Sequence, residues 1–283
     1  MTVFLFTDLE GSTRLWELHP TEMAAALARH DAVLVDAVTS NDGTVVKTTG
    51  DGMMAVFSAV ADCVTACLTA QRRLAAETWA TTAPLRVRMG VNAGDAEARD
   101  GDFHGTAVNR TARIMAVGHG GQVLLSWAAA AMVGESMPSG ASLLDLGIHR
   151  LKDLTEPEHL FQLSHPDLAG TFPPLASLDA RPNNLPMQVS EFFGREEELD
   201  SIRSMVTQPS VRLVTLTGPG GTGKTRLALQ VGADLVERYR DGVYFVDLSA
   251  ERQPDRAFEA IAREMALSGA GEGAALQVLK AKL

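Results

Sequence analysis

Cysteine is scarce in this sequence, with only two residues among 283, Cys63 and Cys67. So few cysteines exclude a fold held together by a set of disulfides. They are typical of a reducing compartment, and we expect a cytoplasmic protein. The two lie four residues apart in a segment with helical periodicity. They therefore predict two small buried side chains rather than a metal or redox site.

Long apolar runs and basic patches are also lacking. No run of about 18 apolar residues occurs, so we expect no membrane-spanning helix. The apolar start, residues 1–7, has no basic residue and leads directly to Asp8 and Glu10, which is not the pattern of a signal peptide. Lys and Arg total 25 against 35 Asp and Glu, a net charge of −10. This balance predicts no direct binding to nucleic acid or to an anionic membrane.

The first 165 residues contain a regular alternation of strand and helix patterns. Short β-rich runs alternate with segments whose hydrophobic residues recur at helical spacing. We expect strands at 3–10, 44–49, 53–57, 85–94, 122–126, 148–153 and 159–164, and helices at 21–38, 60–74 and 108–117. Interleaved elements of this kind predict an α/β (α+β) domain, a sheet covered by helices, over residues 1–165.

Composition changes after this domain. Prolines at 166, 173, 174, 182 and 186 predict a stiff, extended linker over residues 166–190. Residues 191–283 are expected to form a partial P-loop α/β domain, because strand and helix patterns alternate again. We expect its helices at 194–205, 225–239 and 255–265, and its strands at 211–217 and 243–249.

Two aspartates in the first domain lie at expected turns next to glycines. Asp8 ends the first strand, and Asp51 lies at a hairpin tip. Carboxylates placed in this way can hold hard cations through oxygen, although either one alone is more often a turn former or a cap. Between them Gly11, Ser12 and Thr13 open a helix, whose free backbone N–H groups suit a phosphate.

Four segments of the chain make the pattern specific. FTDLEGST, VKTTGDG, DFHGTAVNRTAR and HRLKDL…LFQL resemble, in order and spacing, the class III adenylate/guanylate cyclase catalytic domain. The resemblance covers residues 1–165 and implies a ferredoxin-like fold with helices packed on a central sheet. It implies that Asp8 and Asp51 bind two Mg²⁺ or Mn²⁺ ions per active site, with the Leu9 carbonyl as a further metal ligand.

The same resemblance implies the substrate contacts. Lys47 and Asp102 match the pair that reads the base. A lysine donates to adenine N1 and a carboxylate accepts from the adenine amino group, whereas guanine reverses this pattern, so the pair favours ATP. Asn109 matches the asparagine that orients the ribose, and Arg113 the arginine that stabilises the transition state. Lys152 aligns loosely with a triphosphate-binding lysine, and a solvated surface lysine is an equal alternative.

The resemblance also implies a homodimer with two equivalent sites. The metal-binding aspartates come from one subunit and the base, ribose and phosphate contacts from the other. We therefore expect an adenylate cyclase that makes cyclic AMP and pyrophosphate in intracellular signalling. The alternative is a catalytically weak nucleotide-sensing module of a split ATPase or transcriptional regulator.

The segment GPGGTGKT, residues 218–225, fits the P-loop pattern G-x-x-x-x-G-K-[ST]. Gly218 and Gly223 are glycines of the loop that surrounds a phosphate, Lys224 reaches the β/γ oxygens, and Thr225 can ligate Mg²⁺. The surrounding segments resemble the nucleotide-binding (NB-ARC or AAA-like) ATPases of bacterial LuxR-type regulators, in some of which a cyclase domain comes first. No acidic strand follows to complete the Mg²⁺ site, so we expect a truncated domain that hydrolyses ATP poorly. An ATPase or regulator chain is the partner that would complete it.

Overall fold

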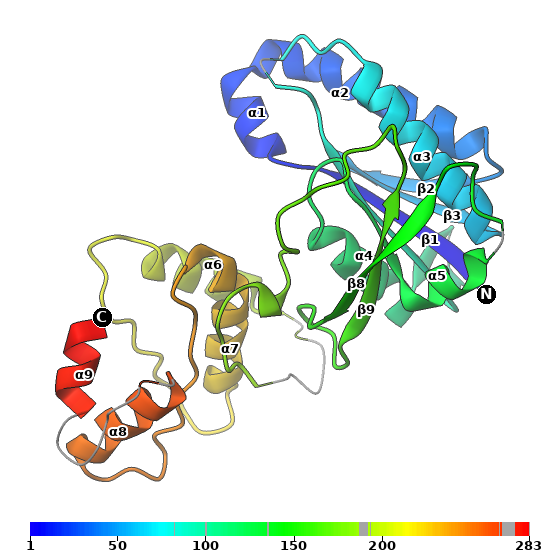
Figure 1. The fold of residues 1–283 in the computed structure, drawn as a ribbon. Helices are drawn as coiled ribbons and strands as arrows, with labels where there is room; N and C mark the ends of the chain where they lie inside the picture. Colours follow the sequence, from blue (N-terminus) through cyan, green and yellow to red (C-terminus); the bar gives the residue numbers. More distant parts are fainter. Residues whose placement is uncertain are drawn as a thin grey trace. The chain divides into compact units, whose positions relative to one another are not determined.

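A computed structural model describes most of the chain (Figure 1). The described residues are 1–81, 83–99, 101–134, 136–186, 192, 194–265, 267 and 275–282. The chain divides into two compact units, Met1–Ser177 and Leu178–Leu283, and each is described by itself.

A seven-stranded sheet forms the centre of the first unit, in the order β2-β3-β1-β4-β7-β9-β8. All neighbours are antiparallel except β4 and β7, which are parallel. The strands are β1 (Thr2–Leu9), β2 (Thr44–Thr49), β3 (Gly52–Phe57), β4 (Val87–Gly94), β7 (Val123–Ser126), β8 (Ser142–His149) and β9 (Glu158–Ser164). A separate two-stranded pair is formed by β5 (Glu97–Arg99) and β6 (Asp102–His104).

Helices cover both faces of this sheet. The helices are α1 (Ser12–Leu18), α2 (Pro20–Thr39), α3 (Val60–Ala76), α4 (Thr106–Ala116) and α5 (Trp127–Val133). Figure 1 shows α2 and α3 side by side over one face. Buried residues of α5 belong to the same apolar cluster as those of α2 and α3, whereas α4 packs through separate clusters.

Side chains of β1 contribute alternately to the apolar clusters on the two faces of the sheet, because successive side chains of a strand point to opposite faces. Val3 and Leu5 join the cluster that includes α2 and α3. Phe4 and Phe6 join the cluster that contains Ala107 of α4. Asp8 has the parity of Phe4 and Phe6, so it lies on the α4 face at the end of the strand.

The structure confirms the α/β class and most expected elements of the first unit. Thr49 pairs with Gly52, so the β2–β3 hairpin has the two-residue tip Gly50-Asp51, and Gly50 has a φ of +67°. A glycine at the first tip position is the requirement of a type II′ turn. One expected strand, 148–153, is misplaced: β8 ends at His149, because its hydrogen-bonding partner β9 begins only at Glu158.

The expected linker, residues 166–190, packs in part on each unit. Leu175 is buried in one cluster with Ile114, and the amide of Ala176 donates to the carbonyl of Val117 at 2.9 Å. In the second unit, the Asn184 side chain bonds both the amide and the carbonyl of Phe245. Residues 187–190 lie outside the described residues.

The regular secondary structure described in the second unit consists of helices. Its helices are the 3₁₀ turns η1 (Leu178–Ala180) and η2 (Val236–Arg238), and α6 (Glu196–Val206), α7 (Lys224–Leu235), α8 (Pro254–Glu264) and α9 (Ala275–Lys282). The two expected strands, 211–217 and 243–249, are wrong, because neither segment forms a ladder. A strand needs hydrogen-bonding neighbours. Here the described residues supply one isolated bridge, Asn183 to Val243, and Leu213 is 83% exposed.

Over the described ranges, no helix combines the length and the apolar character that crossing a membrane requires.

Candidate active site

The C-terminal end of β1 carries the first expected metal ligand, Asp8. Arg88 lies directly opposite on β4. Its Nε and Nη2 contact Asp8 Oδ2 at 2.8 and 2.5 Å, and its Nη1 donates to the carbonyl of Ala116 at 3.0 Å. The carboxylate is about one-quarter exposed, with 26% of the side chain accessible. Arg88 therefore balances the charge of Asp8 and ties it to the end of α4.

Asp51 lies at the hairpin tip beside the same end of β1. The register pairs Thr7 with Met53, and the amide of Met53 donates to Thr7 Oγ1 at 3.2 Å. Asp8 is one residue from this pair along β1, and Asp51 is two residues from it, just before β3, so the two aspartates lie at the same end of two adjacent strands. Asp51 Oδ2 is buried and has no hydrogen-bond partner among the described residues. A buried carboxylate oxygen without a donor is costly unless a cation satisfies it.

This donor set fits a hard divalent cation. Mg²⁺ prefers oxygen ligands and is usually held by one or two carboxylates together with substrate phosphates. Asp8 and Asp51 supply two carboxylates, and Leu9, whose side chain is buried in the core, has only its backbone to offer. No group of three or more His, Cys, Asp or Glu residues suited to a metal occurs in the part of the chain that the structure describes.

The expected base-reading pair is brought together by the fold. Lys47 on β2 and Asp102 on β6 are 55 residues apart, yet Lys47 Nζ lies 2.5 Å from Asp102 Oδ2. The side chains are 40% and 29% exposed, so both are accessible to a ligand. The hydrogen bond from Lys47, with a second from the amide of Phe103, lowers the pKa of Asp102. Asp102 is therefore an ionised acceptor at neutral pH.

Helix α4 presents the other two expected residues. Its buried residues Ala107, Thr111 and Ile114 face the sheet. Asn109 is exposed, and Arg113 is 39% exposed and forms an ion pair with Asp153, Nη2 to Oδ2, at 2.7 Å. The ribose and transition-state contacts of the expected site are thus on a part of α4 that does not pack on the sheet.

The expected phosphate-binding turn follows β1. Gly11 has a φ of +69° and precedes α1, which begins at Ser12 and continues through Thr13. The backbone conformation needed to open the helix is therefore present.

Two charged residues of this site were missed in the sequence. Arg88 bonds Asp8 across 80 residues, and Asp153 bonds Arg113 across 40. Asp153 has a φ of +60°, in the turn that leads from the buried Leu151 toward β9. Asp153 belongs to the run HRLKDL, which carries part of the family resemblance, but no spacing in that run marks its contact with Arg113.

Comparison with known proteins gives the family. A sequence profile of the adenylate and guanylate cyclase catalytic domain matches residues 1–145, just over half of the chain. This chain belongs to that cyclase family. The first unit is therefore a nucleotide cyclase catalytic domain.

Two sequence relatives differ in how much they cover. An uncharacterized protein of Mycobacterium tuberculosis is 38% identical to the cyclase chain over 198 residues, which is 69% of this chain and 67% of that protein. The adenylate cyclase of Schizosaccharomyces pombe is 32% identical over 147 residues, which is 43% of this chain and 9% of that protein.

Solved structures support the cyclase fold. An adenylate cyclase of Trypanosoma brucei in its monomeric state is 26% identical with a TM-score of 0.57, covering 62% of this chain and 94% of that chain. An adenylate/guanylate cyclase/hydrolase of Silicibacter pomeroyi is 27% identical with a TM-score of 0.51, covering 58% and 96%.

The second unit is matched by the NB-ARC domain over residues 195–281. As expected for a P-loop, α7 begins at Lys224 directly after Gly223, which has a φ of +79°. Lys224 Nζ donates to the carbonyls of Gly218 and Pro219 at 3.0 and 2.7 Å. The Lys224 side chain therefore lies across the loop, at the position where it would meet a phosphate.

Proposed function

We propose that this cyclase is an adenylate cyclase, which converts ATP to cyclic AMP and pyrophosphate in intracellular signalling. The observation that carries the proposal is the contact between Lys47 and Asp102. An ammonium that donates to adenine N1, next to a carboxylate that accepts from the amino group, matches adenine and mismatches guanine. Relatives named adenylate cyclase support the same choice.

Two divalent cations, Mg²⁺ or Mn²⁺, would be held by Asp8, Asp51 and the carbonyl of Leu9. When bound, they lower the pKa of the 3′-hydroxyl of ATP and neutralise charge on the triphosphate. Gly11, Ser12 and Thr13 offer backbone N–H groups to the phosphates at the start of α1. The end of β1 and the start of α1 thus supply both the oxygens for the cations and backbone donors for the phosphates.

The ribose 3′-hydroxyl loses its proton to solvent, and its oxygen forms a bond to the α-phosphorus. The bond from that phosphorus to the oxygen shared with the β-phosphate breaks, which releases pyrophosphate. Asn109 orients the ribose so that the hydroxyl is near attack geometry. Arg113 donates to the α-phosphoryl oxygens as their negative charge grows, because a guanidinium stays charged and donates in a fork.

The proposal includes a homodimer with two equivalent sites. Asp8 and Asp51 of one copy meet Lys47, Asp102, Asn109 and Arg113 of the other around a single ATP. Support comes from Asn109 and Arg113, which have accessible side chains while the other face of α4 packs on its own sheet.

The direct test is an assay of the purified chain with ATP and GTP side by side, in Mg²⁺ and in Mn²⁺. We expect cyclic AMP and pyrophosphate in equal amounts, with ATP preferred. Faster cyclisation of GTP would overturn the assignment of Lys47 and Asp102. Nucleotide binding without any turnover would favour the alternative, a nucleotide-sensing module.

Asp153 gives a prediction about Arg113. Asparagine also adopts the left-handed conformation that Asp153 has, so Asp153→Asn removes the charge and keeps the turn. Without its partner, the guanidinium of Arg113 loses its fixed orientation. We expect kcat to fall about tenfold with little change in KM, because the contact acts on the transition state.

The matched control is Glu158→Gln, since Glu158 pairs with Arg110 at 3.3 Å one turn earlier on α4. We expect kcat of this variant to stay within about twofold of the parent, since Arg110 has no role in the proposed site. An equal loss of kcat in both variants would assign Asp153 to the support of α4 alone.

A second function is favoured by the P-loop itself: nucleotide binding by the second unit. Lys224→Ala removes the ammonium that reaches the phosphates, so we expect loss of one class of ATP site in equilibrium binding. Cyclic AMP formation should stay unchanged, because Lys224 takes no part in the proposed cyclase site. A fall in cyclic AMP formation matching the loss of binding would show that the two functions are coupled.

A further inference from the structure

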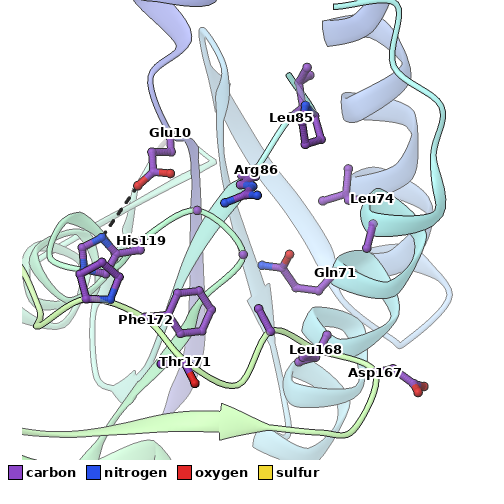
Figure 2. Close-up of a pocket in the computed structure, with 16 residues that line it drawn as sticks. Glu10, Gln71, Leu74, Leu85, Arg86, His119, Asp167, Leu168, Thr171 and Phe172 are labelled. Carbon is purple, nitrogen blue, oxygen red and sulfur yellow. Dashed lines mark ion pairs between the residues drawn. The ribbon is translucent and has the colours of Figure 1, made fainter. Parts of the chain in front are cut away.

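The last residues of the first unit, 172–177, lie along the cyclase domain, and we call this segment the strap. Pro173 and Pro174 fix the backbone angle φ at two consecutive positions, so the strap is stiff. Figure 2 shows the ring of Phe172 beside that of His119; the rings stack with their centroids 6.5 Å apart and an interplanar angle of 7°. His119 Nε2 also lies 3.0 Å from the carbonyl oxygen of Pro174. The start of the strap is therefore fixed to the turn that follows α4.

The last turn of α4 is held from two sides through its carbonyl groups. The end of a helix leaves carbonyls without partners inside the helix. Here the carbonyl of Ala116 accepts from Arg88 Nη1 at 3.0 Å. The next carbonyl, that of Val117, accepts from the amide of Ala176 at 2.9 Å. One contact comes from β4 and the other from the strap, so the strap completes the C-terminal end of α4.

Leu175 is a buried residue of the strap, with 5% of its surface exposed. It belongs to one apolar cluster with Ile114 of α4 and with Leu151, which lies in the turn after β8. Ile114 directly follows Arg113 in the sequence. Leu151 is two residues before Asp153, the partner of Arg113 in the 2.7 Å ion pair. The cluster therefore joins the two elements that carry this ion pair, and Leu175 is part of it.

The strap ends beside the same turn. Ser177 is 3% exposed, and its Oγ lies 3.1 Å from His149 Nδ1. The other ring nitrogen, Nε2, lies 3.0 Å from the carbonyl oxygen of Leu146, which requires the proton on Nε2. Nδ1 of the neutral ring therefore accepts from the serine hydroxyl. His149 is the last residue of β8, so this hydrogen bond fixes the start of the turn that carries Asp153.

From these contacts we propose that Leu175 is a positioning residue for the cyclase reaction. Together with the rest of the strap, it holds α4 and the turn 150–153 in the relative position in which Asp153 orients the guanidinium of Arg113. The inference rests on the proposed function, in which Arg113 stabilises the transition state. Leu175 is buried, so it acts on the reaction through this ion pair and not by contact with the nucleotide.

The test begins with Leu175→Ala in the full chain, which leaves a space in the cluster. We expect kcat for cyclic AMP formation to fall about fivefold with KM for ATP unchanged, because a lost orientation of Arg113 acts on the transition state. Leu175→Met conserves the volume and should keep kcat within about twofold of the parent. If Leu175→Ala does not fold, Leu175→Val takes its place in every comparison, with the same expected order.

The matched control is Leu68→Ala, which removes the same atoms from α3. Leu68 is 3% exposed and belongs to the cluster on the other face of the sheet. This variant should lower the melting temperature by a similar amount and leave kcat near that of the parent. An equal fall of kcat in Leu68→Ala would assign Leu175 to general stability and overturn the proposal.

A double variant separates positioning from independent damage. If Leu175 acts through the ion pair, Leu175→Ala combined with Asp153→Asn should have the same kcat as Asp153→Asn alone, because the pair is already lost. Two losses of kcat that multiply would show that Leu175 acts by another route, and the proposal would be wrong.

Hydrogen exchange of the chain without nucleotide tests the strap apart from catalysis. The amide of Gly118 donates to the carbonyl of Met115 at 3.1 Å, and the amide of Leu154 to that of Leu151 at 3.3 Å. We expect both amides to exchange at least about tenfold faster in Leu175→Ala than in Leu68→Ala. Equal exchange in the two variants would overturn the proposal even in an active adenylate cyclase. If the parent makes no cyclic AMP and exchange is still faster, the proposed function fails while the hold of the strap on α4 and the turn stands.

Discussion

Replacing Asp51 by asparagine is expected to lower the kcat for cyclic AMP formation by at least about 100-fold while the chain stays folded. Loss of a carboxylate that holds a catalytic cation removes several kcal/mol of transition-state stabilisation, and each factor of ten corresponds to about 1.4 kcal/mol. Folding should not suffer, because Asp51 Oδ2 is buried without a partner and its charge is a burden to the metal-free fold. We expect a melting temperature equal to or above that of the parent.

The control for this variant is Asp95→Asn. Asp95 is an exposed aspartate of the same unit, paired only loosely with the N-terminal amine at 3.3 Å. Its replacement should change neither kcat nor the melting temperature. Substantial activity in Asp51→Asn, measured by pyrophosphate release, would remove Asp51 from the site. A collapse of its melting temperature would instead assign it a structural role.

The second large effect concerns the choice of base. The double variant Lys47→Glu with Asp102→Ser replaces the two residues that match adenine. Glutamate accepts from guanine N1–H, and serine donates to guanine O6. We expect kcat/KM for ATP to fall about 100-fold and the ATP-to-GTP preference to invert. Sites built to hydrogen-bond one ligand reject a mismatched one strongly, since their polar groups are left unpaired.

The single variant Lys47→Glu provides the comparison. It places a second carboxylate beside Asp102 at the position where Lys47 Nζ now lies 2.5 Å away. Repulsion between the two carboxylates should lower turnover of both nucleotides without improving GTP. If the double exchange leaves the ATP-to-GTP ratio unchanged, Lys47 and Asp102 do not read the base.

Much of the first unit could be predicted from local pattern. The expected helix 21–38 forms as Pro20–Thr39, and 60–74 forms as Val60–Ala76. Apolar residues at helical spacing form one face, which packs on the core when the segment is a helix. Helix α5, residues 127–133, was missed, since a run of four alanines carries no periodic signal. Family resemblance assigned Lys47 and Asp102 to base recognition, and the structure brings the two side chains into contact, whereas their role stays a prediction.

The features that could not be predicted from the sequence depend on residues that are distant in the chain. The apolar run 211–217 has the composition of a buried strand, but a strand forms only where neighbours complete its hydrogen bonds, and the described residues lack them. Arg88 and Asp153 likewise have no local pattern that marks their contacts with Asp8 and Arg113. Such pairs appear only when the topology is known.

The most direct test of the central claim is to mix two inactive variants, Asp51→Asn and Arg113→Ala. In the proposed homodimer each site takes Asp51 from one copy and Arg113 from the other, so a mixed dimer has one site with both defects and one intact site. Random assembly of equal amounts should restore about a quarter of the parental rate of cyclic AMP formation, where each variant alone has almost none. If the mixture stays as inactive as its components, the active site is not shared between two copies.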